Sequence, residues 1–232
     1  MFKLRSYQKE LLDEPSIQKN LLFQNLKELE IINKYLGGHR ISLAGLEKLI
    51  TDKTKTYKIM DVGCGGGDSL KAIGKWSKHK KYNLVLTGTD LKKDCIDYAR
   101  NNCKEFPEID FRCSDFRDLF TSNKEIDVIH ASLFFHHFHE DDIVGFIKLC
   151  GKSKTILMIN DLERNPIAYY SIKFLTYLFS NSELVRHDAP LSVKRGFKKT
   201  EWQTLLLKAK VRNYVIKNCW AFRHLVIVYP NE

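Results

Sequence analysis

Residues 59–69, IMDVGCGGGDS, run from a short apolar strand through a cluster of glycines into a helical stretch at 70–76. Glycine suits such a turn because the chain bends sharply and the backbone must approach a ligand closely, while free N–H groups at the helix start face the same crevice. A dinucleotide fingerprint, G-x-G-x-x-G counted from Gly63, would need a glycine where Asp68 stands. The spacing is D-x-G-x-G-x-G instead. Taken alone, the turn is also compatible with an ordinary tight connection between a strand and a helix.

Beyond this turn, short apolar runs alternate with amphipathic helical stretches. That alternation is typical of a parallel sheet with helices on both faces. The last two runs are close enough in sequence to form an antiparallel hairpin. We therefore predict an α/β fold with a Rossmann-like seven-stranded sheet, mostly parallel with an antiparallel last strand, plus a helical cap. The expected strands are Lys58–Val62, Leu84–Asp90, Ile109–Cys113, Ile126–Ala131, Thr155–Asp161, Asn213–Lys217 and Phe222–Tyr229.

Two segments fall outside this alternation. Residues 1–54 show apolar residues at helical spacing as far as Gly37-Gly38, and we expect them to form an N-terminal helical cap on a main domain at 55–232. About 50 residues separate the fifth strand from the hairpin, which is more than one crossover helix requires. We therefore expect a substrate lid inserted at about 165–198.

The two parts of this insertion differ in character. Residues 166–179 contain five aromatic residues and one charge, and they are too few to span a bilayer. A helix so apolar must be covered by the N-terminal helices, an apolar ligand, a partner or a membrane surface, so the 166–180 helix is a candidate for peripheral membrane contact. We expect residues 184–197 to form a loop that carries His187 next to Asp188.

Carboxylates follow the next two strands at the edge where the glycine turn lies. Asp90 ends the second strand, 23 residues beyond Gly67, where a carboxylate can accept both ribose hydroxyls of a nucleoside. Asp115 follows the third strand, beside the aromatic Phe116, and is positioned to accept from an adenine amino group. The alternative for each is a solvated carboxylate at a strand end. The fourth strand leads into residues 133–138, LFFHHF.

In order and spacing, these four pieces resemble the class I S-adenosylmethionine-dependent methyltransferases over residues 55–232. The resemblance implies S-adenosylmethionine as the cofactor. It implies that the glycines pass over the methionine and ribose parts and that Asp61 anchors the amino-acid end. Asp90 would hold the ribose hydroxyls, Asp115 the adenine amino group, and the Phe116 N–H a ring nitrogen. The cofactor-binding residues so implied are Asp61, Gly63, Gly65, Gly67, Asp90, Leu91, Asp115, Phe116, His130 and Ala131.

The residues after the fourth strand bear on the methyl acceptor. Enzymes of this superfamily that methylate amino groups of nucleic acids carry Asn- or Asp-Pro-Pro-aromatic there, whereas this chain has SLFFHH at 132–137. That sequence resembles the Leu-His-His type found in methyltransferases of quinones, sterols and other small molecules, with Phe135 in place of the leucine. A neutral imidazole facing the methyl donor can act as a general base toward a hydroxyl. The alternative for each histidine is a local hydrogen bond that shapes the pocket.

The insertion favours a small-molecule acceptor. Together with residues 36–40, the segment 184–197 resembles a group of bacterial methyltransferases associated with polyketide and phenolic-lipid pathways. This resemblance implies a small, apolar, aromatic or phenolic acceptor, with O-methylation favoured over C- or N-methylation. The candidate catalytic residues are His136, His137 and His187, and the candidate substrate-binding residues are Arg40, Tyr169, Tyr170 and Arg195.

The formal net charge of +10 makes an RNA or protein methyltransferase the alternative enzyme. Lys supplies 28 of the 38 basic residues and is spread along the chain, whereas bidentate recognition of phosphate favours Arg. We therefore favour a solvated, lysine-rich surface and expect no nucleic-acid partner. A non-catalytic binding or scaffold protein on the same fold is the alternative from another class, which the intact glycines and Asp90 disfavour.

The remaining features concern the compartment. Six scattered cysteines without a C-x-x-C pair suit reduced thiols, so we expect neither a structural disulfide nor a metal. No stretch reaches the roughly 18 to 20 apolar residues of a membrane span, and residues 1–15 lack the apolar run of a signal peptide. These features favour a cytoplasmic protein. The sequence leaves its oligomeric state open.

Overall fold

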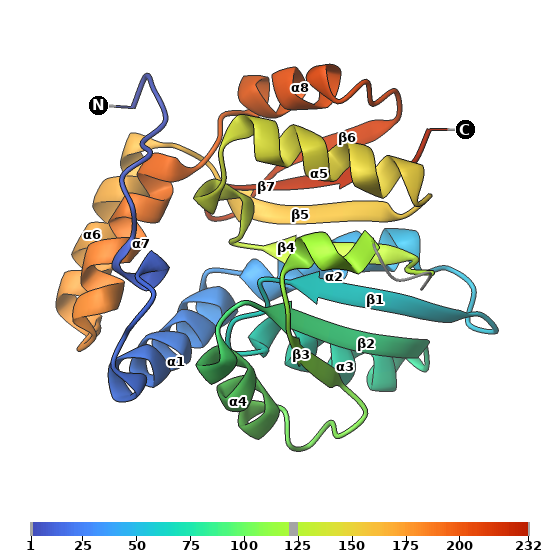
Figure 1. The fold of residues 1–232 in the computed structure, drawn as a ribbon. Coiled ribbons are helices and arrows are strands. Elements are labelled where there is room, and N and C mark those ends of the chain that lie inside the picture. Colours follow the sequence, from blue (N-terminus) through green and yellow to red (C-terminus); the bar gives the residue numbers. More distant parts are fainter. Residues whose placement is uncertain (1, 121–124, 232) are drawn as a thin grey trace.

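The computed structural model describes residues 2–120 and 125–231, and its elements follow the alternation of the sequence (Figure 1). All seven expected strands are present, and their ends lie within two residues of the expected positions. The strands are β1 (Thr56–Val62), β2 (Asn83–Asp90), β3 (Asp110–Cys113), β4 (Val128–Ser132), β5 (Ile156–Leu162), β6 (Tyr214–Cys219) and β7 (Arg223–Val228). The α-helices are α1 (Lys19–Tyr35), α2 (Gly38–Leu49), α3 (Asp68–Lys80), α4 (Lys93–Asn102), α5 (Glu140–Lys152), α6 (Pro166–Phe179), α7 (Glu183–Arg195) and α8 (Lys199–Lys208).

The strands form one sheet in the order β3-β2-β1-β4-β5-β7-β6. Neighbouring strands from β3 to β5 are parallel, and β7 runs antiparallel between β5 and β6. This confirms the mostly parallel sheet with an antiparallel last strand. The chain order reverses between β1 and β4, which are paired although β2 and β3 come between them in sequence. A crevice forms at the carboxyl ends of strands at such a point, and it is where α/β proteins bind ligands.

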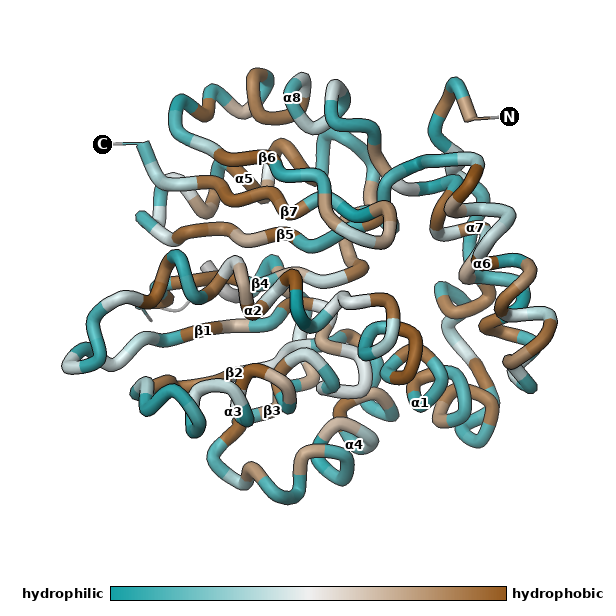
Figure 2. The backbone as a smooth tube through the Cα atoms, turned by 180° about the vertical axis from the view of Figure 1, so that it is seen from behind, coloured by the Kyte–Doolittle hydropathy of each residue, from teal (hydrophilic) through white to brown (hydrophobic). Residues whose placement is uncertain are grey.

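Side chains of β1 alternate between two core clusters, one on each face of the sheet. Met60 and Val62 pack with residues of α5 and α8, whereas Tyr57 and Ile59 pack with residues of α2, α3 and α4. The alternation follows from the period of two along a strand. In Figure 2 the apolar colour runs along the central strands, and most of the apolar residues of β1, β4 and β5 are buried.

The cap lies beyond one end of the sheet and consists of the N-terminal residues, α1, α6 and α7 (Figure 1). α6 packs on α7, and α1 packs on α2, α4 and α7. α2 lies within the 1–54 segment that we expected to form the cap, but it packs on β5 and β7 and buries Ile41 and Leu46 in the core. It therefore belongs to the layer that covers the sheet.

The expectation of a loop at 184–197 is wrong, because most of this segment forms α7. The helix begins after Ser182, whose side-chain oxygen accepts the Val185 N–H at 3.3 Å. Pro190 lacks an N–H and usually interrupts a helix. Here the helix continues through it, since Leu184, Val185 and Leu191 are buried. The outward face of α6 remains exposed at Tyr170, Phe174, Tyr177 and Phe179. No helix in the described part of the chain combines the length and apolar character that crossing a membrane requires.

Candidate functional site

A cavity of about 480 Å³ lies at the carboxyl ends of β1, β2 and β4. One side is formed by the glycine turn at 63–66 together with Asp90 and Leu91. The opposite side comes from residues 12–15 of the N-terminal segment and from α1, and residues 132–138 close a third side. The cavity therefore joins the strand ends to the cap, and its size is within the usual range for small-molecule sites.

Two glycines keep the turn open to the cavity. Gly63 and Gly65 have φ angles of 63° and 51°, a region that residues with a Cβ adopt rarely. A Cβ at Gly63 would lie 2.1 Å from Cδ2 of Phe134, so no side chain fits there. At Gly65 the nearest atom to an added Cβ would be Cδ2 of Leu26, at 3.6 Å. The backbone at Gly65 can thus be approached by a ligand.

Asp90 stands at the tip of β2 beside this turn. Its Oδ2 accepts the Gly65 N–H at 3.0 Å and its Oδ1 accepts the Lys92 N–H at 2.9 Å. Burial raises the pKa of Asp90, and these two hydrogen bonds oppose that effect. Each carboxylate oxygen can accept more than one hydrogen bond, so Asp90 retains acceptor capacity for hydroxyl groups in the cavity.

Asp61, on β1, is held by a chain of buried polar side chains. Oδ1 of Asp61 lies 2.7 Å from Nδ1 of His130, which is its register partner on β4. A carboxylate only accepts, so Nδ1–H of His130 donates and Nε2 accepts from the Ser42 hydroxyl at 2.8 Å. The Asn160 amide donates in turn to Ser42 at 3.0 Å. Burial raises the pKa of Asp61 although His130 lowers it. His130 therefore orients Asp61 from behind rather than lining the cavity.

Sequence reasoning missed three residues that the structure brings together beside the glycine turn. Asp68 and Asn33 line the cavity, and the Asn33 amide donates to Oδ2 of Asp68 at 3.0 Å. Nε2 of His39 lies 2.7 Å from the same oxygen. Burial raises the pKa of Asp68, but the hydrogen bond and charge of His39 outweigh burial. The pKa of Asp68 is therefore lower than its usual value. The position of Asp68 directly after the glycines was the available signal, whereas Asn33 and His39 come from α1 and α2 without a local pattern.

His136 is buried, 2% exposed, behind the cavity wall. Its Nδ1 lies 2.7 Å from Oδ1 of Asp161, and its backbone N–H donates to Oδ2 of Asp161 at 3.1 Å. Burial raises the pKa of Asp161, but the charge and hydrogen bond of His136 outweigh it and lower the pKa to about 2. Nε2 of His136 lies 3.6 Å from Oε1 of Glu10, a carboxylate that the sequence did not single out.

His137 is the candidate catalytic histidine that lines the cavity. Its Nδ1 lies 2.8 Å from Oδ1 of Asp13, another residue of the wall that sequence reasoning missed. Burial raises the pKa of Asp13, but the His137 hydrogen bond and charge reverse this and leave it lowered. His187 lies on α7 outside the lining, with its side chain 43% exposed and its Nδ1 2.7 Å from Oδ1 of Asp188.

The other expected site residues divide between the lining and its surroundings. Leu91 and Phe116 line the cavity, whereas the Asp115 carboxylate binds the Arg117 guanidinium through both oxygens, which lowers its pKa. Arg195 is buried and pairs with Oδ2 of Asp13 at 2.7 Å, behind the wall. The expected residues that do not line the cavity are Gly67, Asp115, His130, Ala131, His136, His187, Arg40, Tyr169, Tyr170 and Arg195.

Comparison with known proteins shows that the chain is similar to methyltransferases. A family described as "Methyltransferase domain" matches residues 59–153. A ubiquinone biosynthesis O-methyltransferase of Coxiella burnetii is 29% identical over 182 residues, which cover 76% of this chain and 70% of that protein. The mitochondrial ubiquinone biosynthesis O-methyltransferase of Saccharomyces cerevisiae is 27% identical over 135 residues, or 53% of this chain and 39% of that protein.

Solved structures share the fold at low identity. The plantazolicin methyltransferase BamL, solved with a triazolic desmethylPZN analog and SAH, has a TM-score of 0.66 at 15% identity, covering 93% of this chain and 95% of its own. Human N-acetylserotonin methyltransferase, solved with SAM, has a TM-score of 0.61 at 16% identity, covering 93% and 57%.

S-adenosylmethionine is the cofactor of this domain. The residues present fit it. The glycine turn leaves backbone open to the cavity at Gly65, and the carboxylate of Asp90 has acceptor sites left for the ribose hydroxyls. Asp61 and Asp68 offer acceptors for the ammonium group of its amino-acid end.

We expect Asp90→Asn to weaken binding of S-adenosylhomocysteine at least about tenfold, which is about 1.4 kcal/mol. The change removes the charge and one acceptor oxygen, and a hydrogen bond to a charged group is worth roughly 1.5 to 3 kcal/mol. Calorimetric titration measures the effect. Asp110→Asn, at the exposed start of β3, is the matched control and should bind as the wild type does. Equal affinity of the Asp90 and Asp110 variants would remove Asp90 from the ribose site.

Asp161→Asn should lower the free energy of unfolding near pH 7 by on the order of 2 kcal/mol. The folded pKa of Asp161, about 2, lies below the usual value of about 3.9, so its stabilisation is complete above pH 4 and is lost as the pH falls toward 2. Urea unfolding of both proteins between pH 7 and pH 2.5 tests this. The difference between wild type and variant should shrink below pH 4, and a constant difference would contradict the assignment.

Proposed function

We propose that this chain, a class I S-adenosylmethionine-dependent methyltransferase, methylates a hydroxyl oxygen of a small, apolar, aromatic acceptor. The observation that carries the proposal is the Asp13–His137 pair in the cavity wall, between phenylalanines at 134 and 138. An acceptor hydroxyl needs a partner for its proton and a place for its ring. This part of the wall offers both.

The apolar part of the wall suits an aromatic ring. Phe116, Phe134 and Phe138 line the cavity and pack against one another, with ring centroids 5.4 Å apart for Phe116–Phe134, 5.1 Å for Phe116–Phe138 and 4.7 Å for Phe134–Phe138. Such edge-to-face and tilted arrangements leave ring faces and edges to receive another aromatic group. Their mutual packing also holds the rings in place before a ligand binds, which lowers the entropy cost of binding.

The proton of the acceptor is the task that we assign to His137. The cofactor supplies a methyl group on a positively charged sulfur, and the protein aligns the acceptor oxygen with it and manages the hydroxyl proton. Because Asp13 accepts from Nδ1–H, the neutral ring of His137 offers its lone pair at Nε2. His136 lies behind the wall, and His187 lies outside it on α7. We therefore narrow the three candidate histidines to His137, with Asp13 and Arg195 as positioning residues.

Two further features support this proposal. The names of the relatives give O-methylation in ubiquinone biosynthesis, which favours oxygen over nitrogen or carbon as the acceptor atom here. All six cysteines are free, as suits a reducing compartment, and we propose a cytoplasmic location.

His137→Gln should lower turnover of an un-ionised phenol by roughly 10² to 10⁴-fold while the affinity for S-adenosylhomocysteine stays near wild type. A phenol with an electron-withdrawing substituent is already ionised at neutral pH, so its turnover should fall much less. Steady-state kinetics with both acceptors separate proton management from positioning, which would slow the two alike.

His79→Gln, at an exposed position near the end of α3, is the matched control for this comparison. Its turnover of both phenols should equal that of the wild type. If His137→Gln keeps turnover of the un-ionised phenol within a factor of about three, proximity alone accounts for catalysis. If His187→Gln causes the loss instead, the proton acceptor lies on α7.

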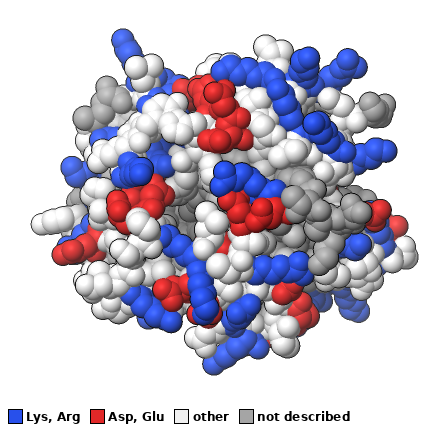
Figure 3. Space-filling view, viewed as in Figure 1, with Lys and Arg blue, Asp and Glu red and all other residues white. Residues whose placement is uncertain are grey.

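We expect no methyl incorporation into RNA, despite the net charge of +10. Figure 3 shows Lys and Arg interspersed with Asp and Glu over the face that it presents, rather than gathered in one basic field. Binding through scattered lysines should be weak and should vanish near about 150 mM salt, because release of counterions dominates it. Filter binding and radiolabel transfer from S-adenosylmethionine test this. Submicromolar binding at that salt, with label in the RNA, would favour an RNA methyltransferase.

A further inference from the structure

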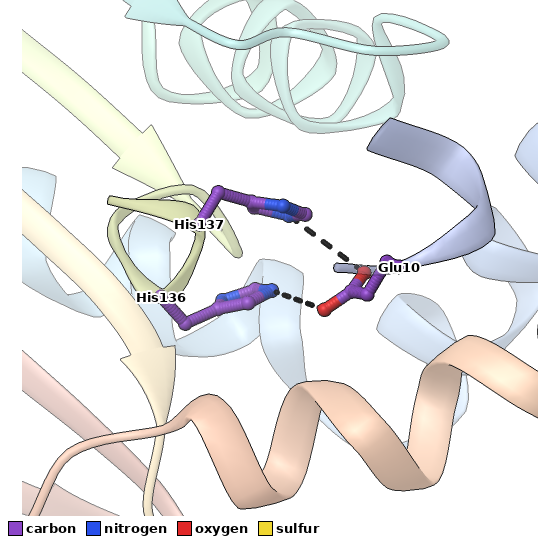
Figure 4. Close-up of side chains that lie close together, drawn as sticks. All are labelled: Glu10, His136 and His137. Carbon is purple, nitrogen blue, oxygen red and sulfur yellow. Dashed lines mark ion pairs between the residues drawn. The ribbon is translucent and has the colours of Figure 1, made fainter. Parts of the chain in front are cut away.

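Behind the wall of the cavity, three side chains from distant parts of the sequence converge on one point. Figure 4 shows Glu10 from the N-terminal segment facing His136 and His137 from the turn after β4. Nε2 of His136 lies 3.6 Å from Oε1 of Glu10, and Nε2 of His137 lies 3.9 Å from Oε2. One ligand atom from each of the three residues lies within 4.8 Å of the others. Glu10 and His136 are almost fully buried, at 3% and 2% exposure.

Each imidazole ring presents Nε2 to Glu10 and is hydrogen-bonded through Nδ1 on its other side. Nδ1 of His136 is bound by Asp161, and Nδ1 of His137 is bound by Asp13. A carboxylate accepts, so both Nδ1 atoms carry a proton, and each Nε2 offers a lone pair when its ring is neutral or a second N–H when its ring is protonated. Both Nε2 atoms thus face the Glu10 carboxylate, at 3.6 and 3.9 Å, and form ion pairs with it when the rings are protonated. These separations are too long for hydrogen bonds, and among the described residues neither Nε2 has another partner.

The Glu10 carboxylate needs positive charge beside it, which either protons on the two imidazole rings or one metal ion bound by all three residues can supply. A zinc ion bonds to imidazole nitrogen at about 2.0 to 2.1 Å and to carboxylate oxygen at about 2.0 to 2.2 Å. At a tetrahedral angle these lengths place nitrogen and oxygen about 3.4 Å apart, close to the observed separations. Ligating histidines also commonly donate their second ring N–H to a carboxylate. Asp161 and Asp13 already occupy that position.

The charges around the cluster favour a cation. Glu10, Asp13, Asp161 and Asp188 are the nearby carboxylates, and the guanidinium groups of Arg5 and Arg195 face them. Four negative groups against two positive ones leave a surplus of two negative charges, if both histidines are neutral. Arg195 lies 3.7 Å from Oε1 of Glu10, but it binds Asp13 more closely, at 2.7 Å. Protons on both imidazole rings or, with neutral rings, one divalent ion would balance this surplus.

The cluster is held in place by residues that do not take part in it. The Ser192 hydroxyl donates to Oε1 of Glu10 at 2.8 Å, and the two N–H groups that follow Glu10 in the chain donate to Asp188. Arg5 donates to the backbone oxygens of His136 and Phe138 at 2.6 and 2.8 Å. Ligands fixed in this way need little rearrangement to bind an ion.

We propose that Glu10, His136 and His137 form a binding site for a divalent transition-metal ion of the zinc type. Two imidazole nitrogens with one carboxylate are a donor set that zinc and neighbouring first-row metals prefer, whereas magnesium prefers oxygen ligands. Three protein ligands leave a fourth position open. Because His137 lines the cavity while Glu10 and His136 lie behind it, the ion lies at the cavity wall. The absence of C-x-x-C pairs, from which we expected no metal, does not bear on a site made of histidines.

The role that we assign to the metal ion deepens the proposed function and rests on it. The existence of the metal site does not depend on the proposed function. A metal ion lowers the pKa of a hydroxyl that binds to it. His137 would then act on the acceptor proton through the ion that it holds. Replacement of His137 would slow un-ionised phenols in either case, so zinc binding is the measurement that distinguishes the two roles.

The experiment measures zinc on the full chain without a methyl acceptor. Protein stripped with EDTA and dialysed is titrated with ZnCl₂ against a chromophoric competing chelator, in the presence and absence of excess MgCl₂. We expect one Zn²⁺ per chain, not displaced by Mg²⁺. Glu10→Gln keeps the size of the side chain and its acceptor for Ser192, and should weaken zinc binding by at least about 100-fold. Glu105→Gln, an exposed glutamate outside the cluster, is the matched control and should bind zinc as the wild type does.

Two further measurements keep the test decisive if Glu10→Gln fails to fold. His137→Gln should weaken zinc binding similarly, and X-ray absorption of the wild-type zinc complex should show imidazole and oxygen ligands without sulfur. Failure to bind zinc, sulfur ligation, or unchanged affinity in both variants would overturn the metal site. S-adenosylhomocysteine binding on the same samples separates the outcomes. If the protein binds S-adenosylhomocysteine but does not bind zinc, the metal site is refuted and the proposed function stands. If zinc binds but no phenol is methylated, the proposed function fails and the site stands.

Discussion

The position of the N-terminal segment is the constraint on which the proposed acceptor side of the cavity depends. Asp188 sets it, because its two carboxylate oxygens accept the N–H groups of Leu11 and Leu12 at 2.8 and 2.9 Å. Hydrogen bonds to a charged acceptor contribute roughly 1.5 to 3 kcal/mol each. Asp13 follows directly and lines the cavity beside His137. If Asp188 lost these contacts, a wall of the cavity would be released together with the chain terminus.

One face of α7 supplies the remaining contacts to this segment. Asp188, Ser192 and Arg195 are spaced four and three residues apart, so they lie on the same side of the helix. Ser192 binds Glu10, and Arg195 binds Asp13. The three side chains therefore act as a row that fixes the segment at successive residues. Their burial requires that each polar group has a partner, and the row meets this requirement.

The sequence indicated the glycine turn and Asp90, which line the cavity, but it did not indicate that Asp13 meets His137, and this difference has a physical reason. The glycine turn and Asp90 follow directly from their strands, so local pattern and parallel pairing bring them together. Asp13 and His137 are 124 residues apart and meet only through the packing of the N-terminal segment, which leaves no periodic signal. A loop at 184–197, as expected from the sequence, lacks the helical spacing that aligns Asp188, Ser192 and Arg195 on α7.

The two sides also differ in how freely they can change. Asp61 and Asp90 sit on strands whose register is fixed by backbone hydrogen bonds across the sheet, so shifting either one would disturb its neighbours. The acceptor side rests on single side-chain contacts between α7 and an extended segment, which a few substitutions can rearrange without touching the sheet. A new acceptor can therefore be accommodated while the cofactor site stays intact. The sheet therefore positions Asp61 and Asp90, whereas the proposed acceptor side depends on the contacts of residues 10–13.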